Sequence, residues 1–458
     1  MITTESKHQF ITLSSFQKLG FWDYYTLSKK ANIFSNYPLV ELNSVLKQRK
    51  KSIVIEDAEI YKRCRVQLYG NGVILREPGG IEGKKIKTKK QQVCKTNDFL
   101  VAEIDAKFGG YGIVPDALND AIVSSHYFLF EIDTKLLLPE FLGLVVKCND
   151  FSKQVKATGS TNYAAIRPYH VLGYLIPLPT LEEQNQIVEA YNNRIAQAER
   201  LETEAKQLED GIEEYVFKEL YVIKNSSVQA ISGLSFLSYK EIERWALSHL
   251  LKQRLFSFKQ VKYAIQPLKN LLSFFEGGKT PSTSRNDFWG GTICWTSAKD
   301  MKSIKITDSQ DKITGKAVDE SGLTIYPKGT ILGVFRSGIL RHSFPVAITE
   351  VETTINQDLK AMGIKEDVVS KEYFLNYLNV FQKMIIERSQ KVGVTVESIN
   401  TEEFLEIPVI IPPIEIQNRI STQIENTRNQ IDNIKVQALT QRQQAITEFE
   451  SKIFMPCN

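Results

Sequence analysis

Two long segments of the chain carry apolar residues at helical spacing on an otherwise polar surface. The first begins at Pro179-Thr180, where Thr180 and Glu183 have the spacing of a capping box. Its apolar positions alternate in steps of three and four, with one extra three-residue step after Ala198. This pattern predicts a heptad helix with a local stammer. The predicted seam residues are Val188, Tyr191, Ile195, Ala198, Leu201, Ala205, Leu208 and Ile212.

The second segment begins near Pro413, a residue suited to the first position of a helix, and keeps the same alternation. Its seam comprises Ile420, Ile424, Ile431, Ile434, Ala438 and Ala445. A stripe this narrow on a helix of about 40 residues buries little by itself, so each helix needs a long partner. We expect the two helices to pair with each other, antiparallel, as a rod of about 60 Å. A dimerisation coiled coil, or a helix lying on a module surface, would show the same stripe.

The strings that open these helices are copies of each other. IPLPTLEEQNQI ends at Ile187 and VIIPPIEIQNRI ends at Ile420, an offset of about 233 residues. Each half reads as short β-rich runs followed by a long helix. We therefore predict an α+β fold with two tandem mixed domains separated by two long helices in an antiparallel coiled coil. The predicted ranges are 1–178 and 223–411 for the domains, and 179–222 and 412–458 for the helices.

Composition fits this picture. With 458 residues and 42% hydrophobic content, the chain is too long for a single core. No apolar run approaches the roughly 20 residues of a membrane-spanning helix, and the polar N-terminus does not resemble a signal peptide. We expect a cytoplasmic protein. The five cysteines are isolated in sequence, which argues against a disulfide framework or a zinc site.

The sequence offers little catalytic chemistry. The Gly-Lys-Thr at 278–280 would need a glycine at position 273 to form a phosphate-binding loop, and that position is Ser273. Glu82-Gly83-Lys84 has the Glu-x-Lys form of many nucleases, but we interpret it as a solvated turn. The five histidines lie far apart without ligand spacing. We therefore predict a non-catalytic chain without a metal site.

Positive charge is more local than the net charge of +4 indicates. Between Gly83 and Thr96 there are six lysines and no acid: Lys84, Lys85, Lys87, Lys89, Lys90 and Lys95. Such a run is either a solvated loop or a phosphate-contacting surface. In the second half, cations alternate with Ser and Thr hydroxyls, a mixture suited to recognition in a DNA groove. We interpret the nearby Trp289 and Trp295 as framework rather than as platforms for bases.

These features together resemble the specificity subunit of type I restriction-modification enzymes. A target-recognition domain of that family often opens with Gly-x-Thr-Pro-Ser and continues into Trp-Gly-Gly and Ile-x-Trp. This chain has the corresponding strings at 278–282, 289–291 and 293–295, and an Ile-Asn-Gln-Asp string at 355–358. The repeated helix units resemble the conserved helical regions of the family. The first half lacks the Thr-Pro-Ser and Trp-Gly-Gly strings and resembles another domain subtype.

The resemblance implies a division of labour. Each target-recognition domain would read one half of a bipartite DNA sequence, and the helices would fix the spacer between the halves. Adenine methylation with S-adenosylmethionine, and ATP- and Mg²⁺-dependent translocation and cleavage, would belong to partner modification and restriction subunits. The expected partners are therefore double-stranded DNA, methyltransferase subunits and restriction subunits.

On this basis we assign candidate DNA contacts in both domains. In the second domain they are Lys279, Thr280, Ser282, Ser284, Arg285, Arg336 and Arg341, and in the first Lys84, Lys85, Lys87, Lys89, Lys90, Thr161, Asn162 and Arg167. Two other functions stay open. A coiled-coil scaffold or a DNA-binding adaptor outside restriction-modification would also explain the helices, and a self-sufficient nuclease would need acidic metal ligands that the sequence does not show.

Overall fold

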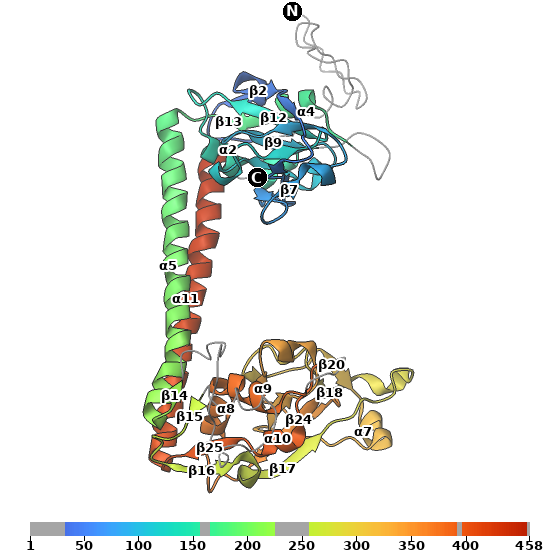
Figure 1. Cartoon of the computed structure of the whole chain (residues 1–458), viewed down its shortest axis with the longest axis vertical. Coiled ribbons are helices and arrows are strands. Elements are labelled where there is room, and N and C mark those ends of the chain that lie inside the picture. Colours follow the sequence, from blue (N-terminus) through green and yellow to red (C-terminus); the bar gives the residue numbers. More distant parts are fainter. Residues whose placement is uncertain (1–32, 156–164, 225–255, 392–395, 456–458) are drawn as a thin grey trace, which may run out of the picture. The chain divides into compact units, whose positions relative to one another are not determined.

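The computed structural model describes residues 33–155, 165–224, 256–391 and 396–455. These residues form two compact units. The first contains the described residues up to Arg200 and those from Gln437 onwards, and the second runs from Leu201 to Val436. Each unit holds a mixed α+β region and part of both long helices (Figure 1). The predicted fold class is confirmed. No helix in the described ranges is long and apolar enough to cross a membrane.

The core of the first unit is an antiparallel sheet in the order β10-β9-β12-β2. Its strands are β2 (Leu46–Arg49), β9 (Phe99–Ala102), β10 (Tyr111–Ile113) and β12 (Tyr127–Ile132). Helix α2 (Pro139–Val145) buries Phe141, Leu142 and Val145 completely in the same core as Phe99 and Phe130 of the sheet. Burial of these large side chains supplies the main driving force for the unit to fold.

Smaller elements surround this core. The sheet β11-β8-β3 consists of β3 (Ser52–Val54), β8 (Lys90–Val93) and β11 (Ile122–Val123). Two short antiparallel pairs join β4 (Ile60–Tyr61) with β7 (Ile81–Glu82), and β5 (Cys64–Val66) with β6 (Val73–Leu75). The short helices are α3 (Asn149–Ser152) and α4 (Pro168–Leu172), and β1 (Leu39–Glu41) pairs with β13 (Leu175–Pro177) just before the first long helix.

The second unit repeats this design. Its main sheet has the order β17-β24-β21-β22-β19, with β17 (Leu272–Gly277), β19 (Lys305–Ile306), β21 (Ile331–Val334), β22 (Val346–Thr349) and β24 (Leu359–Ile364). A second sheet, β20-β18-β23, contains β18 (Trp289–Thr296), β20 (Asp311–Ile313) and β23 (Thr353–Ile355). The helices are α7 (Gly315–Ser321), α8 (Lys371–Val380), α9 (Gln382–Ser389) and α10 (Thr401–Leu405).

The internal repeat is visible in the strand order. The order β10-β9-β12-β2 in the first unit matches β22-β21-β24-β17 in the second, and all neighbouring pairs are antiparallel. In the second unit β16 (Ala264–Pro267) pairs with β25 (Pro408–Ile411) just before the second long helix, as β1 pairs with β13 before the first. After the first long helix, β14 (Ile223–Lys224) pairs with β15 (Phe256–Ser257).

A buried glutamine marks the start of each long helix. The Gln184 side chain accepts a hydrogen bond from the Leu138 backbone N–H at 2.8 Å and donates to the carbonyls of Leu136 and Pro179, each at 2.9 Å. Gln417 repeats this set in the second unit with the Ser370 N–H and the carbonyls of Val368 and Pro412. We call these two sets of bonds the glutamine clamps. They explain why a glutamine recurs at the same place in both copies.

The two long helices are α5 (Leu181–Leu220) and α11 (Ile414–Ile453). The predicted capping box opens α5, since the Thr180 N–H donates to the Glu183 carboxylate at 2.9 Å and the Glu183 N–H donates to the Thr180 hydroxyl at 3.3 Å. The helix continues without a break through the stammer at Ala198.

Contacts between the helices show antiparallel pairing in each unit (Figure 1). In the first unit Arg194 binds Glu448 through two bonds of 2.6 and 2.5 Å. In the second unit Lys435 binds Glu209 at 2.6 Å and Arg419 binds Glu219 at 2.5 Å. Higher residue numbers on α5 thus face lower numbers on α11.

The seam residues differ in their burial. All six predicted seam residues of α11 are buried, together with Val188, Ala198 and Ala205 of α5. The other α5 positions are half-buried because the partner helix covers only a narrow stripe; they are Tyr191, Ile195, Leu201, Leu208 and Ile212. Phe449 and Ile453 extend the α11 stripe beyond the predicted set and join the core of the first unit.

Candidate nucleic-acid interface

The loop between β17 and β18 carries five of the candidate DNA contacts. Two tryptophans donate hydrogen bonds to its backbone. The Trp289 indole N–H donates to the Ser282 carbonyl at 3.2 Å, and the Trp295 indole N–H donates to the Lys279 carbonyl at 3.2 Å. The two rings meet edge to face, with centroids 5.1 Å apart. Both tryptophans therefore support the loop backbone, as the framework interpretation expects.

The motif glycines lie where no side chain fits. A Cβ at Gly278 would lie 1.9 Å from the Ile355 carbonyl oxygen, and one at Gly291 would lie 2.2 Å from the Ile313 carbonyl oxygen. These contacts are far below van der Waals distance, and both obstacles are backbone atoms that cannot move alone. Gly278 of the Gly-x-Thr-Pro-Ser string and Gly291 of the Trp-Gly-Gly string are thus steric requirements of this fold.

The loop is joined to the Ile355–Asp358 segment, which lies more than 70 residues away in the sequence. The Lys279 backbone N–H donates to the Ile355 carbonyl at 3.1 Å, and the Thr280 hydroxyl bonds the Gln357 side chain. On the other side, the Asn356 N–H donates to the Thr296 carbonyl at 3.0 Å. The structure therefore brings the two motifs that carried the family resemblance onto one surface.

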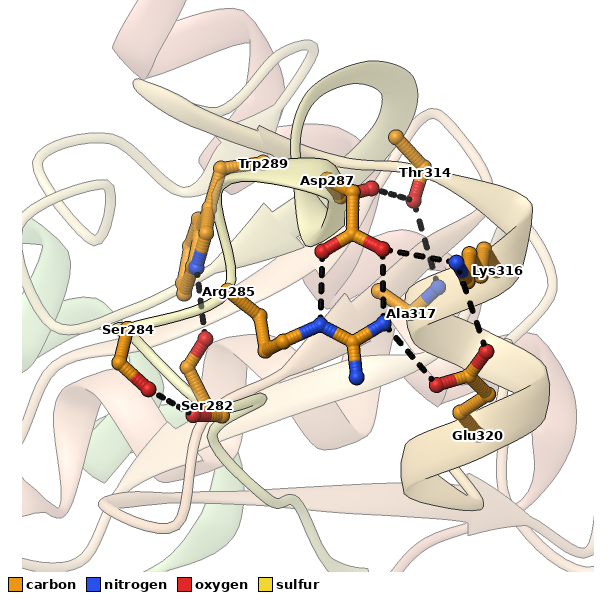
Figure 2. A network of polar contacts seen from close by, with 9 residues as sticks. All are labelled: Ser282, Ser284, Arg285, Asp287, Trp289, Thr314, Lys316, Ala317 and Glu320. Atoms are coloured by element: carbon orange, nitrogen blue, oxygen red, sulfur yellow. Dashed lines mark hydrogen bonds and ion pairs between the residues drawn. The ribbon is translucent and has the colours of Figure 1, made fainter.

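Arg285 is the most strongly held cation of this loop (Figure 2). Its Nε and Nη2 donate to the two Asp287 carboxylate oxygens at 2.7 Å each, and Nη2 also reaches Glu320 at 3.3 Å. Lys316 contacts the same Asp287 carboxylate at 2.8 Å. The guanidinium carbon lies 4.3 Å from the centroid of the Phe288 ring.

These neighbours set the charge state of the pair. The hydrogen bond from Arg285, followed by that from Lys316, holds the pKa of Asp287 well below its usual range. The carboxylate is therefore ionised and keeps the guanidinium in one orientation. In the described chain, the Nη1 group of Arg285 has no hydrogen-bond partner, so it is available to an acceptor such as a phosphate or the edge of a guanine.

The hydroxyls of Ser282 and Ser284 lie 2.9 Å apart beside Arg285, and Lys279 Nζ donates to the Gly322 carbonyl at 3.2 Å. All of these groups are exposed. The loop therefore presents two cations and two hydroxyls to solvent from a rigid backbone, a composition that can contact both phosphates and base edges.

The two remaining candidate contacts of the second unit are Arg336 and Arg341. The Arg336 backbone N–H donates to the Asp358 carbonyl at 3.2 Å, and its exposed side chain makes no ion pair within the described residues. Arg341 belongs to the 3-10 turn η9 (Gly338–Arg341), where its Nε donates to Glu397 at 2.5 Å. Arg336 thus adjoins the Ile355–Asp358 segment, whereas Arg341 is paired with the Glu397 carboxylate.

In the first unit, acids outside the lysine run offset much of its charge. Lys84 and Lys85 pair with Glu82 at 2.9 and 3.6 Å, and Lys89 pairs with Asp57 at 2.5 Å. Lys95 pairs with Asp120 at 2.6 Å. Lys87 and Lys90 are exposed and make no ion pair within the described residues. Sequence reasoning missed these acids because Asp57 and Asp120 reach the run only through the fold.

Arg167 stands at the N-cap of α4, where its Nη1 binds Glu103 at 2.7 Å. The same carboxylate faces His126 Nδ1 at 2.9 Å. Arg167 is exposed and lies apart in sequence from the lysine run. Thr161 and Asn162 fall outside the described residues.

Two cysteines that are isolated in sequence meet inside the first unit. The Sγ atoms of Cys64 and Cys94 lie 3.5 Å apart, and both residues are buried free thiols. The hydrogen bond from Cys64, together with burial, raises the pKa of the Cys94 thiol. Within the described ranges, no three His, Cys, Asp or Glu side chains gather as a metal site.

Comparison with known proteins identifies the family. The model of the type I restriction modification DNA specificity domain matches twice, at residues 35–210 and 260–442. The chain is 33% identical over 170 residues to the EcoR124I/EcoR124II specificity subunit of Escherichia coli, covering 37% of this chain and 42% of that protein. It therefore spans about two fifths of that relative's length. It is 23% identical over 402 residues to the HindI specificity subunit of Haemophilus influenzae, covering 76% of this chain and 85% of that subunit.

A solved structure supports the fold. A chain from a study of complex assembly and conformational transition in the type I restriction-modification system matches with a TM-score of 0.58 at 18% identity, covering 92% of this chain and 98% of that one. The two family matches coincide with the two structural repeats and together cover more than half of the chain. The chain therefore belongs to the type I restriction modification DNA specificity family.

Proposed function

We propose that this chain is the DNA-recognition subunit of a type I restriction-modification complex, in which each unit reads one half of a bipartite target. Specificity subunits of this family recognise DNA and leave catalysis to other subunits. The observation that carries the proposal is the duplication, because the same sheet order and the same glutamine clamp precede each long helix. Two similar reading units in one chain suit a target made of two parts.

The chemistry of the second unit supports DNA as its ligand. Its exposed loop combines Lys279 and Arg285 with the hydroxyls of Ser282 and Ser284 on a backbone held by two indole hydrogen bonds. A rigid scaffold lowers the entropic cost of ordering these groups on a groove. Cations would contact phosphates for affinity, and Arg285 would contact a base edge for selectivity.

The long helices would set the spacing between the two half-sites. Each has 40 residues, which at 1.5 Å per residue gives a length of about 60 Å, more than one 34 Å turn of duplex DNA. Their antiparallel pairing within each unit supports this role. In the proposed complex, adenine methylation with S-adenosylmethionine and ATP- and Mg²⁺-dependent cleavage are performed by partner methyltransferase and restriction subunits, in the cytoplasm.

The experiment that tests the proposal is an adenine-methylation map of the source cells with the gene, without it, and with it restored. We expect one split motif to lose methylation on deletion and to regain it on complementation. Complementation with a variant that carries alanine at Lys279, Thr280, Ser282, Ser284 and Arg285 should give a methylated motif in which one half is poorly defined. A matched control, Lys328→Ala, removes an exposed lysine of the same unit that pairs with Glu350.

One outcome of the methylation map would contradict the proposal. If the methyltransferase subunits are expressed and the map does not change on deletion, the chain does not direct methylation. Duplex binding by the purified full chain, titrated with salt, would then separate a DNA-binding adaptor, whose affinity falls steeply with salt, from a coiled-coil scaffold that does not bind DNA.

A further inference from the structure

The hairpin formed by β5 and β6 ends in an unusual tip. The turn closes with the Gln67 N–H donating to the Gly72 carbonyl at 2.8 Å, and three of its residues have left-handed backbone: Tyr69 at φ 60°, Gly70 at 72° and Gly72 at 83°. Glycine accepts this conformation readily, but a bulky aromatic residue does so only at a cost. Tyr69 is nevertheless 81% exposed, so its ring gains no burial in return. The folding of the hairpin does not account for this tyrosine.

A second turn braces the tip. The Tyr69 N–H donates to the Phe108 carbonyl at 2.7 Å and the Gly70 N–H donates to the Gly109 carbonyl at 3.1 Å, which fixes the tip against the 3-10 turn η4 (Asp105–Phe108). The approach is so close that a Cβ at Gly109 would lie 2.8 Å from the Gly70 nitrogen. Phe108 is itself 49% exposed. Two adjoining turns therefore present two aromatic residues to solvent from a rigid base.

The charges around these rings favour an anionic partner. Lys107 Nζ lies 5.0 Å from the centroid of the Phe108 ring, and the aliphatic part of Lys147 packs beside Gly70. Neither lysine makes an ion pair within the described residues, unlike Lys84, Lys85 and Lys89 of the lysine run. The one acid of these turns is Asp105. We call residues 68–71, 105–108 and 147 the hairpin-tip patch.

The internal repeat relates turn η4 of this patch to a turn of the second unit that carries candidate DNA contacts. Turn η4 follows strand β9, as turn η9 with its preceding Arg336 follows the corresponding strand β21 of the second unit. Glu103, which binds Arg167, lies two residues before the start of η4. Turn η4 of the patch therefore occupies the same place in the strand order of the first unit as the candidate contacts Arg336 and Arg341 in the second.

We propose that the hairpin-tip patch is a duplex-DNA contact of the first unit. Lys107 and Lys147 contact phosphates, while the rings of Tyr69 and Phe108 enter a groove and press against a deformable base step. An aromatic wedge requires rings that are exposed, held rigidly and flanked by cations, and the patch combines these three properties. The inference rests on the proposed function and adds residues that the sequence did not indicate.

The test uses the purified full chain and duplexes that contain the methylated motif, with 2-aminopurine placed in turn at each half-site. The variant Tyr69→Gly removes the ring and also relieves the left-handed strain. We expect it to unfold at the same denaturant concentration as the wild type or a higher one, yet to bind the duplex about tenfold more weakly. Phe108→Ala should act in the same direction. In complexes of these variants, the 2-aminopurine fluorescence that reports unstacking should be lower than with the wild type, and at one half-site only.

Tyr221→Gly is the matched control, because Tyr221 is also a left-handed, partly exposed tyrosine, with φ 57°, but lies at the end of α5. It should leave binding unchanged. Lys107→Gln and Lys147→Gln should each reduce the salt dependence of binding by about one released counterion.

Three results would overturn the inference: normal affinity in Tyr69→Gly and Phe108→Ala, a loss of stability that parallels the loss of binding, or an equal loss in Tyr221→Gly. The proposed function fails separately, if the wild-type chain shows no preference for the motif duplex over a scrambled one.

Discussion

At the residue scale, Gly278 shows how a sequence motif can be a packing requirement. A methyl group there would overlap the Ile355 carbonyl oxygen and push the Lys279–Arg285 loop away from the Ile355–Asp358 segment. We predict that Gly278→Ala destabilises the second unit by about 1–3 kcal/mol and weakens recognition of one half-site. Denaturant unfolding and the methylation map would measure both effects.

Gly338→Ala is the control for this prediction. Gly338 lies in the same unit, its backbone is not left-handed, and a Cβ added there would meet no other atom within 4 Å. The substitution should leave stability and recognition almost unchanged. Equal behaviour of the two alanine variants would contradict the steric explanation.

Asp287 illustrates a positioning residue. Its carboxylate orients Arg285, so Asp287→Ala should relax the same target position as Arg285→Ala, where the loss of a base contact costs about 1–3 kcal/mol of discrimination. Asp319→Ala removes the same charge from α7, where Asp319 makes no ion pair in the described chain, and should preserve selectivity. Competition binding with single-base variants of the target would show whether the first two substitutions affect one shared position. Different positions would rule out this role.

The pH dependence of the pair follows from the lowered pKa of Asp287. A carboxylate with a depressed pKa contributes above the unfolded value, near 3.9, and the contribution is lost as the pH falls through the folded pKa. Selectivity at the Arg285 position should therefore stay constant from about pH 8 to pH 5. Competition binding across this pH range would measure the selectivity, and a loss of selectivity near pH 6 would implicate another titratable group.

Residue patterns revealed some of these features and concealed others. The strings around Gly278 and Trp289 were recognisable because their residue types are required locally. Asp287 lies only two residues after Arg285, so an Arg-x-Asp pattern in a turn was a readable signal that the sequence interpretation overlooked. Lys316, Glu320 and the acids that face the lysine run reach their partners through tertiary structure, which no local pattern encodes.

At the element scale, the glutamine clamps join each long helix to the sheet region before it. Gln184→Leu and Gln417→Leu would each leave a partly buried N–H and two carbonyls without their side-chain partner. Each unsatisfied group costs about 1–3 kcal/mol, so either variant should strongly destabilise its own unit. Gln186→Leu changes an exposed glutamine of the same helix and serves as the control. Equilibrium unfolding of all three variants would test this prediction. Similar unfolding midpoints for the clamp variants and the control would refute a structural role for the clamps.

The elements differ in how far the sequence predicted them. The long helices were predictable because their heptads and the Thr180 capping box are local signals. Strand pairing was not, since β10, β9, β12 and β2 come together from positions spread over more than 80 residues. The hairpin tip at Tyr69 was also missed, because a single aromatic residue beside a Gly-Asn-Gly string has no periodicity to detect.

At the scale of the whole molecule, the proposed role of the helix pair is to fix the spacing between the two half-sites. Ile434 is buried between the helices with Ala205 and Ile431, so Ile434→Pro should break α11 at a cost of about 3 kcal/mol or more and uncouple the half-sites. Ile434→Ala empties the same site but preserves the helix, and should keep the normal spacing. The methylation map would distinguish them, and an unchanged split motif in the proline variant would disprove the spacing role.

The repeated clamp also bears on how genes of this kind can change. Strand, glutamine and helix start recur in the same order at both junctions, so a crossover at that point leaves every clamp bond with an equivalent partner. Genetic recombination between two such genes would then exchange whole sheet regions at a conserved junction, and the exchanged region of the first unit would have to pack against the retained Phe449 and Ile453 of α11. Under the proposed function, such an exchange would produce a new pair of half-sites in one step rather than through a series of destabilising point mutations.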